Sequence, residues 1–191
     1  MSRDLLHQDE IHALVRDAYR AVESGSRVVA EKLYSPEELA GVPEIAIDGA
    51  LGVGNHLHHA RIAPGDVVLD LGCGFGIDSI LAARRTGPSG RVIALDFLPE
   101  MLEKTAEAAA EAGLDNIEAL EGAMEAIPLP KASVDSVISN GVVNLSPRKA
   151  RVLAECARVL RPGGEICLAD VTVEEEELPA EVLTHPATWA G

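Results

Sequence analysis

A glycine-rich turn preceded by an acid could bind a ligand close to residue 70. In the stretch VVLDLGCGFGID, Asp70 comes just before Gly72, Gly74 and Gly76. Glycines make a tight turn possible and let backbone N–H groups approach a ligand at the N-terminus of the next helix. A dinucleotide-binding turn has the spacing G-x-G-x-x-G and holds a pyrophosphate, which an adjacent acid would repel. The spacing G-x-G-x-G with Asp70 therefore favours a ligand with a cationic amino-acid end and disfavours a nicotinamide-dependent reductase.

A second acid, Asp96, follows twenty residues after Gly76, in the stretch VIALDF. A carboxylate at the end of the second strand can accept hydrogen bonds from both hydroxyls of a ribose, and it would exclude a 2′-phosphate. The glycine turn alone is as typical of a structural turn as of a binding site. Together with Asp96 at this distance, it indicates an adenosyl amino acid as the ligand.

The composition limits the partners that the chain could have. Sixteen Lys and Arg against 31 Asp and Glu give a formal charge of −15, which would repel phosphate backbones and anionic membrane surfaces. The N-terminus has no apolar signal region, and no apolar run approaches the roughly 20 residues of a membrane span. Three cysteines at no zinc-like spacing fit a reducing compartment. We therefore expect a cytoplasmic protein with a small-molecule partner, and neither nucleic acid nor a membrane.

Short apolar runs alternate with helical stretches from residue 67 onward, a β-α-β rhythm that predicts a doubly wound, mostly parallel sheet of the α/β class. The helical stretches have apolar residues at helical spacing, and two of them open on a proline. The expected strands are 67–71, 91–96, 116–122, 134–140 and 165–171, and the expected helices are 79–87, 99–113 and 147–160.

The two ends of the chain differ from this core. We expect a helix over 11–24 and a short helix in YSPEELAG, where Ser35 is the N-cap and Glu38 stands three residues later. The acidic run EEEE is expected to be a solvated loop. The predicted organisation is an N-terminal helical cap over 1–60, a ligand-binding domain over 61–173 and an acidic tail over 174–191.

Four motifs in order make residues 60 to 173 resemble the class I S-adenosylmethionine-dependent methyltransferases: LDLGCGFG, LDFLPEML, GAMEAIPLP and RVLRPGGEICLAD. The resemblance implies S-adenosyl-L-methionine as the cofactor and a Rossmann-like sheet. It places Asp70 at the methionine ammonium group and Asp96 at the ribose. The remaining implied contacts are the turn residues Gly72, Cys73, Gly74 and Gly76, the adenine neighbours Phe97, Met101 and Met124, and Asn140.

The stretch after the third strand departs from this family. Many relatives have an acid at the position of Ala123, where it accepts the adenine amino group. Glu125 or a backbone carbonyl could take that role. The loss of one charge-assisted hydrogen bond would weaken cofactor binding by about 1.5–3 kcal/mol, so we expect looser binding rather than none.

Within this superfamily the chain is similar to the arsenite methyltransferases, through EKLYSPEELAGVPE, LDFLPEMLEK and ISNGVVNLSPRK. That family captures trivalent arsenic with cysteine thiolates, because a soft metal centre prefers soft ligands. Here the family's thiol positions carry other residues: one falls in the stretch 52–54, around Val53, a second at Gly141, and a third beyond Trp189. We therefore expect methyl transfer to a small molecule other than arsenite, with Gly141, Val53 and His56 in the substrate pocket.

Few residues could act as a catalytic base. A soft nucleophile would need none, because the sulfonium donor is already activated. An oxygen or carbon nucleophile would need help, for which the candidates are Tyr19, Asn140, Asn144 and His56. The missing thiols leave open a non-catalytic cofactor-binding or regulatory protein, or a fragment of a longer arsenite methyltransferase.

His56 and His59 in GNHLHHA could share a helix face, but without a third ligand nearby we predict no metal site.

Class I methyltransferases usually have two more strands after the fifth, for which the stretch after residue 171 leaves no room. The sheet is then expected to end early, with an exposed edge that pairs with a second copy in a homodimer or is covered by the N-terminal segment.

Overall fold

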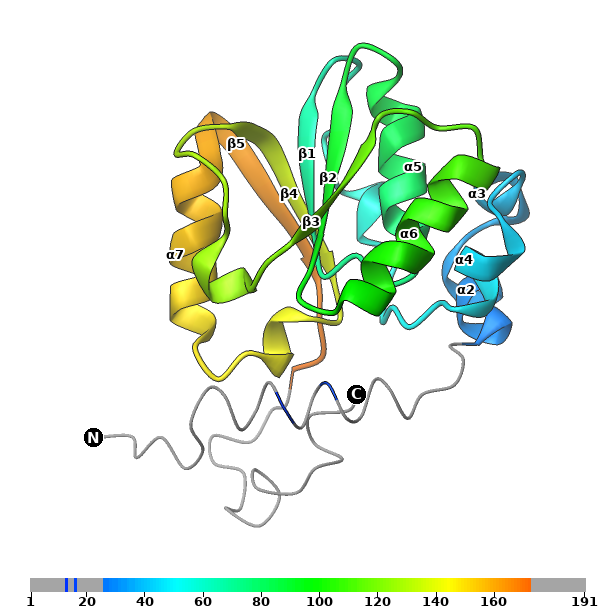
Figure 1. Ribbon diagram of the computed structural model, residues 1–191, viewed down its shortest axis with the longest axis horizontal. Helices are drawn as coiled ribbons and strands as arrows, with labels where there is room; N and C mark the ends of the chain where they lie inside the picture. The colour runs from blue at the N-terminus through cyan, green and yellow to red at the C-terminus, as the bar shows by residue number, and fades with distance from the viewer. Residues whose placement is uncertain (1–12, 14–15, 17–25, 173–191) are drawn as a thin grey trace.

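Five parallel strands form one sheet in the computed structural model, which describes Ala13, Arg16 and residues 26–172. The strand order is β3-β2-β1-β4-β5 (Figure 1). Strands β2 and β3 are thus added on one side of β1, and β4 and β5 on the other, so the strand order reverses between β1 and β4. The strands are β1 (Val67–Leu71), β2 (Arg91–Asp96), β3 (Ile117–Glu121), β4 (Val134–Asn140) and β5 (Leu160–Ala169). The predicted doubly wound parallel sheet is confirmed.

Helices cover both faces of the sheet. On one face lie α5 (Ile77–Thr86) and α6 (Pro99–Glu111), and on the other lies α7 (Lys149–Val159). Adjacent residues of β1 point to opposite faces: Val68 packs in the cluster that contains α5, while Leu69 packs in the cluster that contains α7. The central strands are therefore buried on both faces of the sheet, which explains their continuous apolar runs.

The strand boundaries at the sheet centre agree with the sequence, whereas those of β5 do not. β1, β2 and β4 have the predicted bounds. β5 begins at Leu160 rather than 165, because Leu160 already pairs with Val134 before an irregularity shifts the register to Ser136 opposite Glu165. Among the described strands, β3 and β5 are the two edges of the sheet.

Three short N-terminal helices pack on the outer side of α5 and α6 (Figure 1): α2 (Arg27–Leu33), α3 (Pro36–Leu39) and α4 (Glu44–Asp48). The predicted capping box is present, since the Glu38 N–H donates to Ser35 Oγ at 3.3 Å and the Ser35 N–H donates to Glu38 Oε2 at 2.9 Å. Most of the helix expected over 11–24 lies outside the described residues. Within the described part of the chain, no helix has the length and apolar character that a membrane crossing requires.

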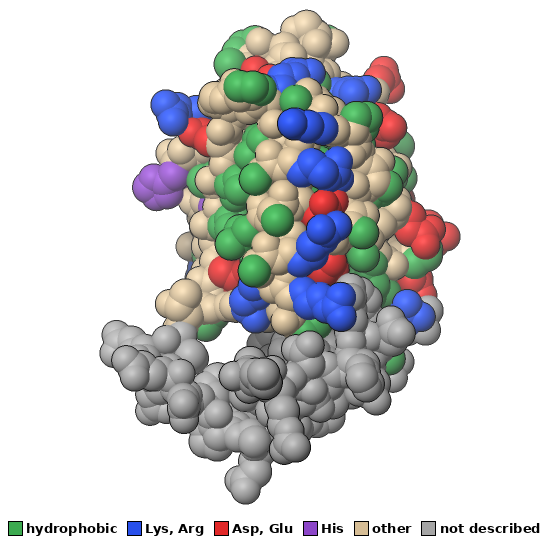
Figure 2. All heavy atoms as spheres, turned by 90° about the vertical axis from the view of Figure 1, so that its left-hand side faces the viewer, with side chains coloured by type: hydrophobic (Ala, Val, Ile, Leu, Met, Phe, Trp, Pro, Cys, Tyr) green, Lys and Arg blue, Asp and Glu red, His purple; other side chains and the backbone are tan. Residues whose placement is uncertain are grey.

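The face formed by α7 and β5 carries a column of Lys and Arg side chains beside apolar ones (Figure 2), although the chain as a whole is acidic. Beneath this face lies Glu155, whose carboxylate is 93% buried as a side chain. It accepts hydrogen bonds from the Ile127 N–H at 3.0 Å and from Arg158 Nη2 at 2.7 Å. Arg158 in turn donates to the carbonyl oxygens of Leu129 and Ile127. This network fixes α7 to the loop before β4.

We expect Glu155→Gln to lower the free energy of unfolding by about 1.5–3 kcal/mol, because it removes a charged acceptor of several hydrogen bonds. Chemical denaturation at neutral pH measures the change. The matched control is Glu107→Gln, which removes an exposed ion pair to Lys104 and should change stability by less than about 0.5 kcal/mol. Equal effects of the two substitutions would contradict the role of Glu155.

Candidate functional site

The main cavity lies at the carboxyl ends of β1, β2 and β4, where the strand order reverses. Ligands of open α/β sheets bind at such a reversal, because the loops after neighbouring strands diverge there and leave a crevice. The predicted site residues that line it are Asp70, Gly72, Cys73, Gly74, Asp96, Phe97, Met101, Met124, Asn140 and Gly141.

The glycine-rich turn forms the floor of the cavity between β1 and α5. Gly72 has φ +77°, and a Cβ there would lie 2.5 Å from Cγ1 of Val142. Only glycine accepts this conformation without strain and lets the chain after β4 approach so closely. Gly76 does not line the cavity and is instead the N-cap of α5, with φ +84°. At Gly72 and Gly74 the turn therefore presents backbone to a ligand, while Cys73 and Phe75 between and after them also line the cavity.

Asp70 is almost fully buried at the end of β1. Its Oδ2 accepts a hydrogen bond of 2.5 Å from the Ser79 hydroxyl. Burial, together with the negative charges of Asp78 and Asp96, raises the pKa of Asp70 to about 8, while the Ser79 hydrogen bond opposes the rise. Three acids therefore share one cavity, and a cation bound among them would relieve their repulsion.

Asp96 ends β2 and is held by the backbone around it. Oδ1 accepts from the Leu98 N–H at 3.0 Å, and Oδ2 accepts from the Gly74 N–H at 3.1 Å. Burial raises the pKa of Asp96, although these hydrogen bonds lower it. Because a carboxylate has about four acceptor positions, its two oxygens can still accept hydrogen bonds from a ligand.

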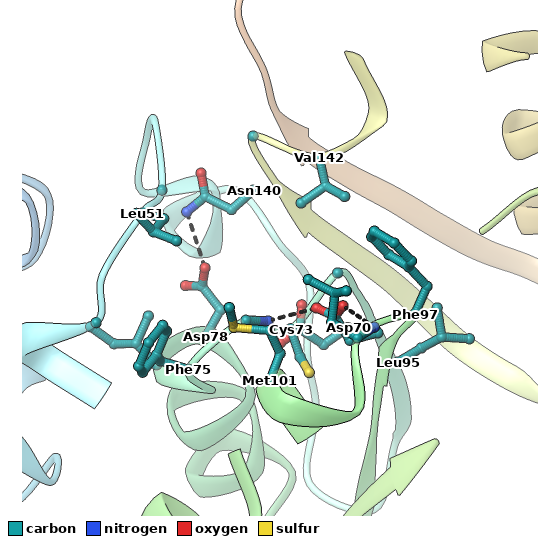
Figure 3. A pocket seen from close by; sticks show the side chains of 18 of the residues that line it. Leu51, Asp70, Cys73, Phe75, Asp78, Leu95, Phe97, Met101, Asn140 and Val142 are labelled. Carbon is teal, nitrogen blue, oxygen red and sulfur yellow. Dashed lines mark hydrogen bonds between the residues drawn. The ribbon is translucent and has the colours of Figure 1, made fainter. Parts of the chain in front are cut away.

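An apolar wall lies beside Asp96, formed by Phe97, Leu95, Met101 and Met124. Figure 3 shows Phe97 on the same side of the cavity as Val142 and Leu95. Met124 and Phe97 also line a smaller adjoining cavity. That smaller cavity contains Ala123 and Glu125, and the buried Glu125 carboxylate accepts a hydrogen bond from the Ser146 hydroxyl at 2.5 Å. Glu125 therefore lines the smaller cavity next to Phe97 and Met124, and Ala123 has no polar side chain to offer there.

Asn140 ends β4 and connects four segments of the chain. Its Oδ1 accepts from the Val53 N–H at 2.8 Å, and its Nδ2 donates to the Gly54 carbonyl at 2.8 Å and to Asp78 Oδ2 at 3.0 Å. Tyr34 completes the network, because its hydroxyl donates to Asp78 Oδ1 at 2.7 Å. Asn140 thus fixes the 51–54 loop against the sheet.

Neither Asp78 nor Tyr34 was among the site residues predicted from the sequence. Asp78 lines the cavity and is drawn with Asn140 in Figure 3, and Tyr34 is buried behind it. The only local signal for Asp78 is its place two residues after Gly76, in the first turn of α5.

Val53 and Gly141 lie side by side although they are far apart in the sequence. A Cβ built on Gly141 would lie 3.2 Å from Cγ1 of Val53, and Gly141 has φ +72°. Gly141 lines the cavity, and Val53 lies next to it with 44% of its surface exposed. An apolar side chain and a glycine therefore meet at the cavity rim, at Gly141 and within the stretch 52–54, where the sequence resemblance places two thiols of the arsenite methyltransferases.

His56 and Asn144, two further residues predicted for the site, do not line the cavity. His56 is buried in the 3-10 turn η1 (His56–His58) and does not line the cavity. Asn144 lies in η3 (Val143–Leu145), where its N–H donates to Asp170 Oδ2 at 2.9 Å and its side chain contacts the Val171 carbonyl. Tyr19 lies outside the described residues.

Burial lowers the pKa of His56, and Arg85 adds to the effect while Asp78 opposes it. A histidine whose pKa is lower in the folded state than its ordinary 6.5 stabilises the fold less as the pH falls below that value. We therefore expect His56→Leu to gain melting temperature relative to the unsubstituted protein as the pH falls from 7.5 to 5. Differential scanning calorimetry of both proteins over this range checks the prediction. Parallel curves would show that His56 does not control the acid sensitivity.

The three cysteines do not form a thiol site among the described residues. Burial raises the pKa of Cys73 well above its ordinary value and that of Cys156 to about 11. Cys167 is half-buried, burial raises its pKa, and its thiol donates to the His56 carbonyl at 3.1 Å. Within the ranges that the structure covers, no group of three His, Cys, Asp or Glu residues is placed to hold a metal ion.

Comparison with known proteins agrees with this geometry. A family model described as a methyltransferase domain matches residues 62–190, about two-thirds of the chain. The chain therefore belongs to this methyltransferase family, in the class I, S-adenosylmethionine-dependent group. Within that group it is similar to an arsenite methyltransferase of Halobacterium salinarum, with 43% identity over 158 residues, which are 83% of this chain and 40% of that protein.

Solved structures show the same likeness. An arsenic(III) S-adenosylmethionine methyltransferase of Chlamydomonas reinhardtii superimposes with a TM-score of 0.72 and 40% identity, over 79% of this chain and 52% of that one. A SAM-dependent methyltransferase of Aquifex aeolicus has a TM-score of 0.59 and 25% identity, over 80% of this chain and 77% of that one.

A demethylmenaquinone methyltransferase of Listeria monocytogenes is also similar, with 40% identity over 113 residues, which are 59% of this chain and 47% of that protein. The chain thus spans less than half the length of the curated relatives that it matches.

Proposed function

We propose that this chain binds S-adenosyl-L-methionine and transfers its methyl group to a small molecule that is not arsenite. The observation that supports this most is the cavity at the strand ends, where the buried carboxylates of Asp70, Asp78 and Asp96 line the same space as the glycine-rich turn. A ligand with a cationic sulfur, an ammonium group and a ribose fits such a set of acceptors. A dinucleotide pyrophosphate does not, because it would meet buried carboxylates.

The residues of the cavity divide the expected contacts between them. Asp96 accepts hydrogen bonds from the ribose hydroxyls, and Phe97, Met101 and Met124 cover the faces of the adenine. Glu125 stands closest to the role of the acid that is missing at Ala123. Gly72, Cys73 and Gly74 offer their backbone, and the carboxylates favour the positive charge. When bound, the cofactor supplies an activated methyl group; the chain contributes orientation and exclusion of water.

The acceptor side of the cavity is apolar, with Leu51, Val53, Gly141 and Val142 along its rim. An arsenite-binding site would require thiolates there, and the residues present cannot ligate a metalloid. A soft neutral nucleophile needs no base and tolerates an apolar contact. We therefore favour a small acceptor with a soft nucleophilic atom over an oxygen or carbon acceptor. Tyr19, a candidate base for an oxygen or carbon acceptor, lies outside the described residues.

Calorimetry followed by a turnover screen tests the proposal. S-adenosylmethionine and S-adenosylhomocysteine should both bind. If neither binds at millimolar concentration, the proposed methyltransferase function is ruled out. If both bind, small thiols, metalloids and phenols are offered as methyl acceptors, and product is followed as S-adenosylhomocysteine release. We expect turnover with a soft acceptor and none with arsenite.

We expect Gly141→Cys alone not to confer methylation of arsenite. A single thiolate cannot hold trivalent arsenic in place of the family's set, and the substitution also places a side chain at φ +72° against Val53. The double substitution Val53→Cys with Gly141→Cys is the comparison, because these two positions touch. Arsenite methylation by the single variant, followed by mass spectrometry of methylated arsenic, would contradict this account of the missing ligands.

A second candidate is a cofactor-binding protein without catalysis, which the replacement of both adjoining thiol positions favours. It predicts cofactor binding without turnover of any acceptor class. The same screen therefore separates the two candidates.

A further inference from the structure

Asp78 differs from the other acids of the cavity in how it is held. It lies in the first turn of α5, lines the cavity and is 6% exposed. Its Oδ1 accepts from the Tyr34 hydroxyl at 2.7 Å, and its Oδ2 accepts from Asn140 Nδ2 at 3.0 Å. Tyr34 follows α2 and Asn140 ends β4, so two segments more than 40 residues away on either side hold this carboxylate. Such convergence orients the side chain without neutralising it.

Two neutral donors hold Asp78, the hydroxyl of Tyr34 and the side-chain amide of Asn140. Each oxygen of a carboxylate can accept more than one hydrogen bond, so Asp78 has acceptor positions left on the side that lines the cavity. These positions can accept hydrogen bonds from an ammonium group of a ligand.

All three acids line the cavity, and the charges of both Asp78 and Asp96 act on Asp70. Figure 3 shows Asp78 on the side of Phe75 and Leu51, and Asp70 on the side of Phe97 and Leu95. Phe97 directly follows Asp96, the proposed ribose acceptor, so Asp78 lies on the side of the cavity away from Phe97.

Asp70 is less suited than Asp78 to contact a terminal ammonium group. It is 2% exposed at the end of β1, and burial together with the neighbouring acids raises its pKa to about 8, so the carboxyl is largely protonated at neutral pH. Phe75, which lines the cavity near Asp78, adds an aromatic ring beside the same end. An ammonium group favours such a combination of carboxylate and ring face.

We propose that Asp78 binds the ammonium group at the amino-acid end of the cofactor, with Tyr34 and Asn140 as positioning residues. This inference rests on the proposed function and reassigns to Asp78 the contact that the sequence predicted for Asp70. The segment that contains Tyr34 thereby becomes part of the cofactor site, although Tyr34 itself does not line the cavity.

Two ligands that differ only at the amino-acid end test the assignment. S-adenosylhomocysteine has that end, and 5′-methylthioadenosine has adenosine and sulfur without it. We expect Asp78→Asn to weaken binding of S-adenosylhomocysteine by about 10- to 100-fold in calorimetry, and to change binding of 5′-methylthioadenosine by less than about twofold. Tyr34→Phe, which frees the carboxylate from one donor, should weaken S-adenosylhomocysteine binding by about 3- to 10-fold with the same selectivity.

Asp48→Asn is the matched control, because Asp48 is an exposed aspartate paired with Arg27 on the surface. It should leave both affinities unchanged. Thermal melting without ligand shows whether each variant is folded. If Asp78→Asn is not folded, the assignment is tested by the ratio of the affinities of Tyr34→Phe for S-adenosylhomocysteine and 5′-methylthioadenosine.

An equal loss for both ligands, or no loss for either, would overturn the assignment of Asp78. If the unsubstituted protein binds neither ligand, the proposed function itself fails and this inference falls with it. If the unsubstituted protein binds S-adenosylhomocysteine and both variants keep its ratio of affinities for the two ligands, the proposed function stands. Only the assignment of the ammonium contact to Asp78 is then wrong.

Discussion

Replacement of Asp96 by alanine should weaken binding of S-adenosylhomocysteine by roughly 100-fold or more. The carboxylate is the proposed acceptor of two ribose hydroxyls, and each hydrogen bond to a charged acceptor contributes about 1.5–3 kcal/mol. Asp96 also accepts the N–H groups of Gly74 and Leu98, so its loss releases the glycine turn from β2. Both effects act on the bound state.

Calorimetry of S-adenosylhomocysteine binding measures this effect, and Glu121→Gln is the control. Glu121 is paired in register with Asp96 on the neighbouring strand, but it is exposed. Glu121→Gln should keep the affinity for S-adenosylhomocysteine within about twofold of that of the unsubstituted protein. A folded Asp96→Ala variant with an affinity loss of less than threefold would rule out the ribose contact.

The central strands could be predicted from the sequence because burial on both faces makes them continuous apolar runs. β1, β2 and β4 have the expected bounds for this reason. The early start of β5 could not be predicted, since it depends on a register irregularity opposite Val134. Irregularities of this kind depend on the partner strand and leave no local pattern in RPGG.

The residues of the candidate site could be predicted where they lie at the end of a strand. Asp70 and Asp96 end β1 and β2, and the sheet brings their carboxyl ends to one edge. The contact of Tyr34 with Asp78 spans 44 residues and is set by how the N-terminal helices pack on α5, which no local spacing encodes. His56 shows the converse: its spacing to His59 suggested an accessible face, but in the short turn η1 the ring points into the core.

The meeting of Val53 and Gly141 connects the fold to the substrate question. Asn140 holds the backbone N–H of Val53, so the end of β4 itself brings the 51–54 loop to the cavity rim. The same framework would bring two thiols together in a chain that had them. The proposed difference in acceptor between this chain and an arsenite methyltransferase therefore requires a change of two side chains and no change of the fold.

We expect the affinity for S-adenosylhomocysteine to rise as the pH rises from 6.5 toward 8, and to level off above that. Burial and the charges of Asp78 and Asp96 raise the pKa of Asp70 to about 8 in the ligand-free chain, so the carboxyl is largely protonated at pH 6.5. A cationic ligand favours the ionised carboxylate, and one released proton gives a limiting slope of tenfold in affinity per pH unit.

The same pKa fixes the sign of the stability effect in the absence of ligand. A carboxyl whose pKa is raised from an ordinary 3.8 to about 8 in the folded state contributes stability at low pH, and this contribution is lost as the pH rises through about 8. The melting temperature of the ligand-free protein should therefore fall toward pH 8.5, and less so in Asp70→Asn.

Binding calorimetry from pH 6.5 to 8.5, in buffers of different ionisation enthalpy, counts the released protons directly. Asp70→Asn should remove the part of the slope near pH 8 and leave only that of Asp96, whose pKa burial also raises. Ser79→Ala should move the profile to higher pH, because the Ser79 hydrogen bond lowers the pKa of Asp70. If the slope survives in Asp70→Asn, or moves to lower pH in Ser79→Ala, another group carries the proton, and the three acids do not act on the ligand as one anionic site.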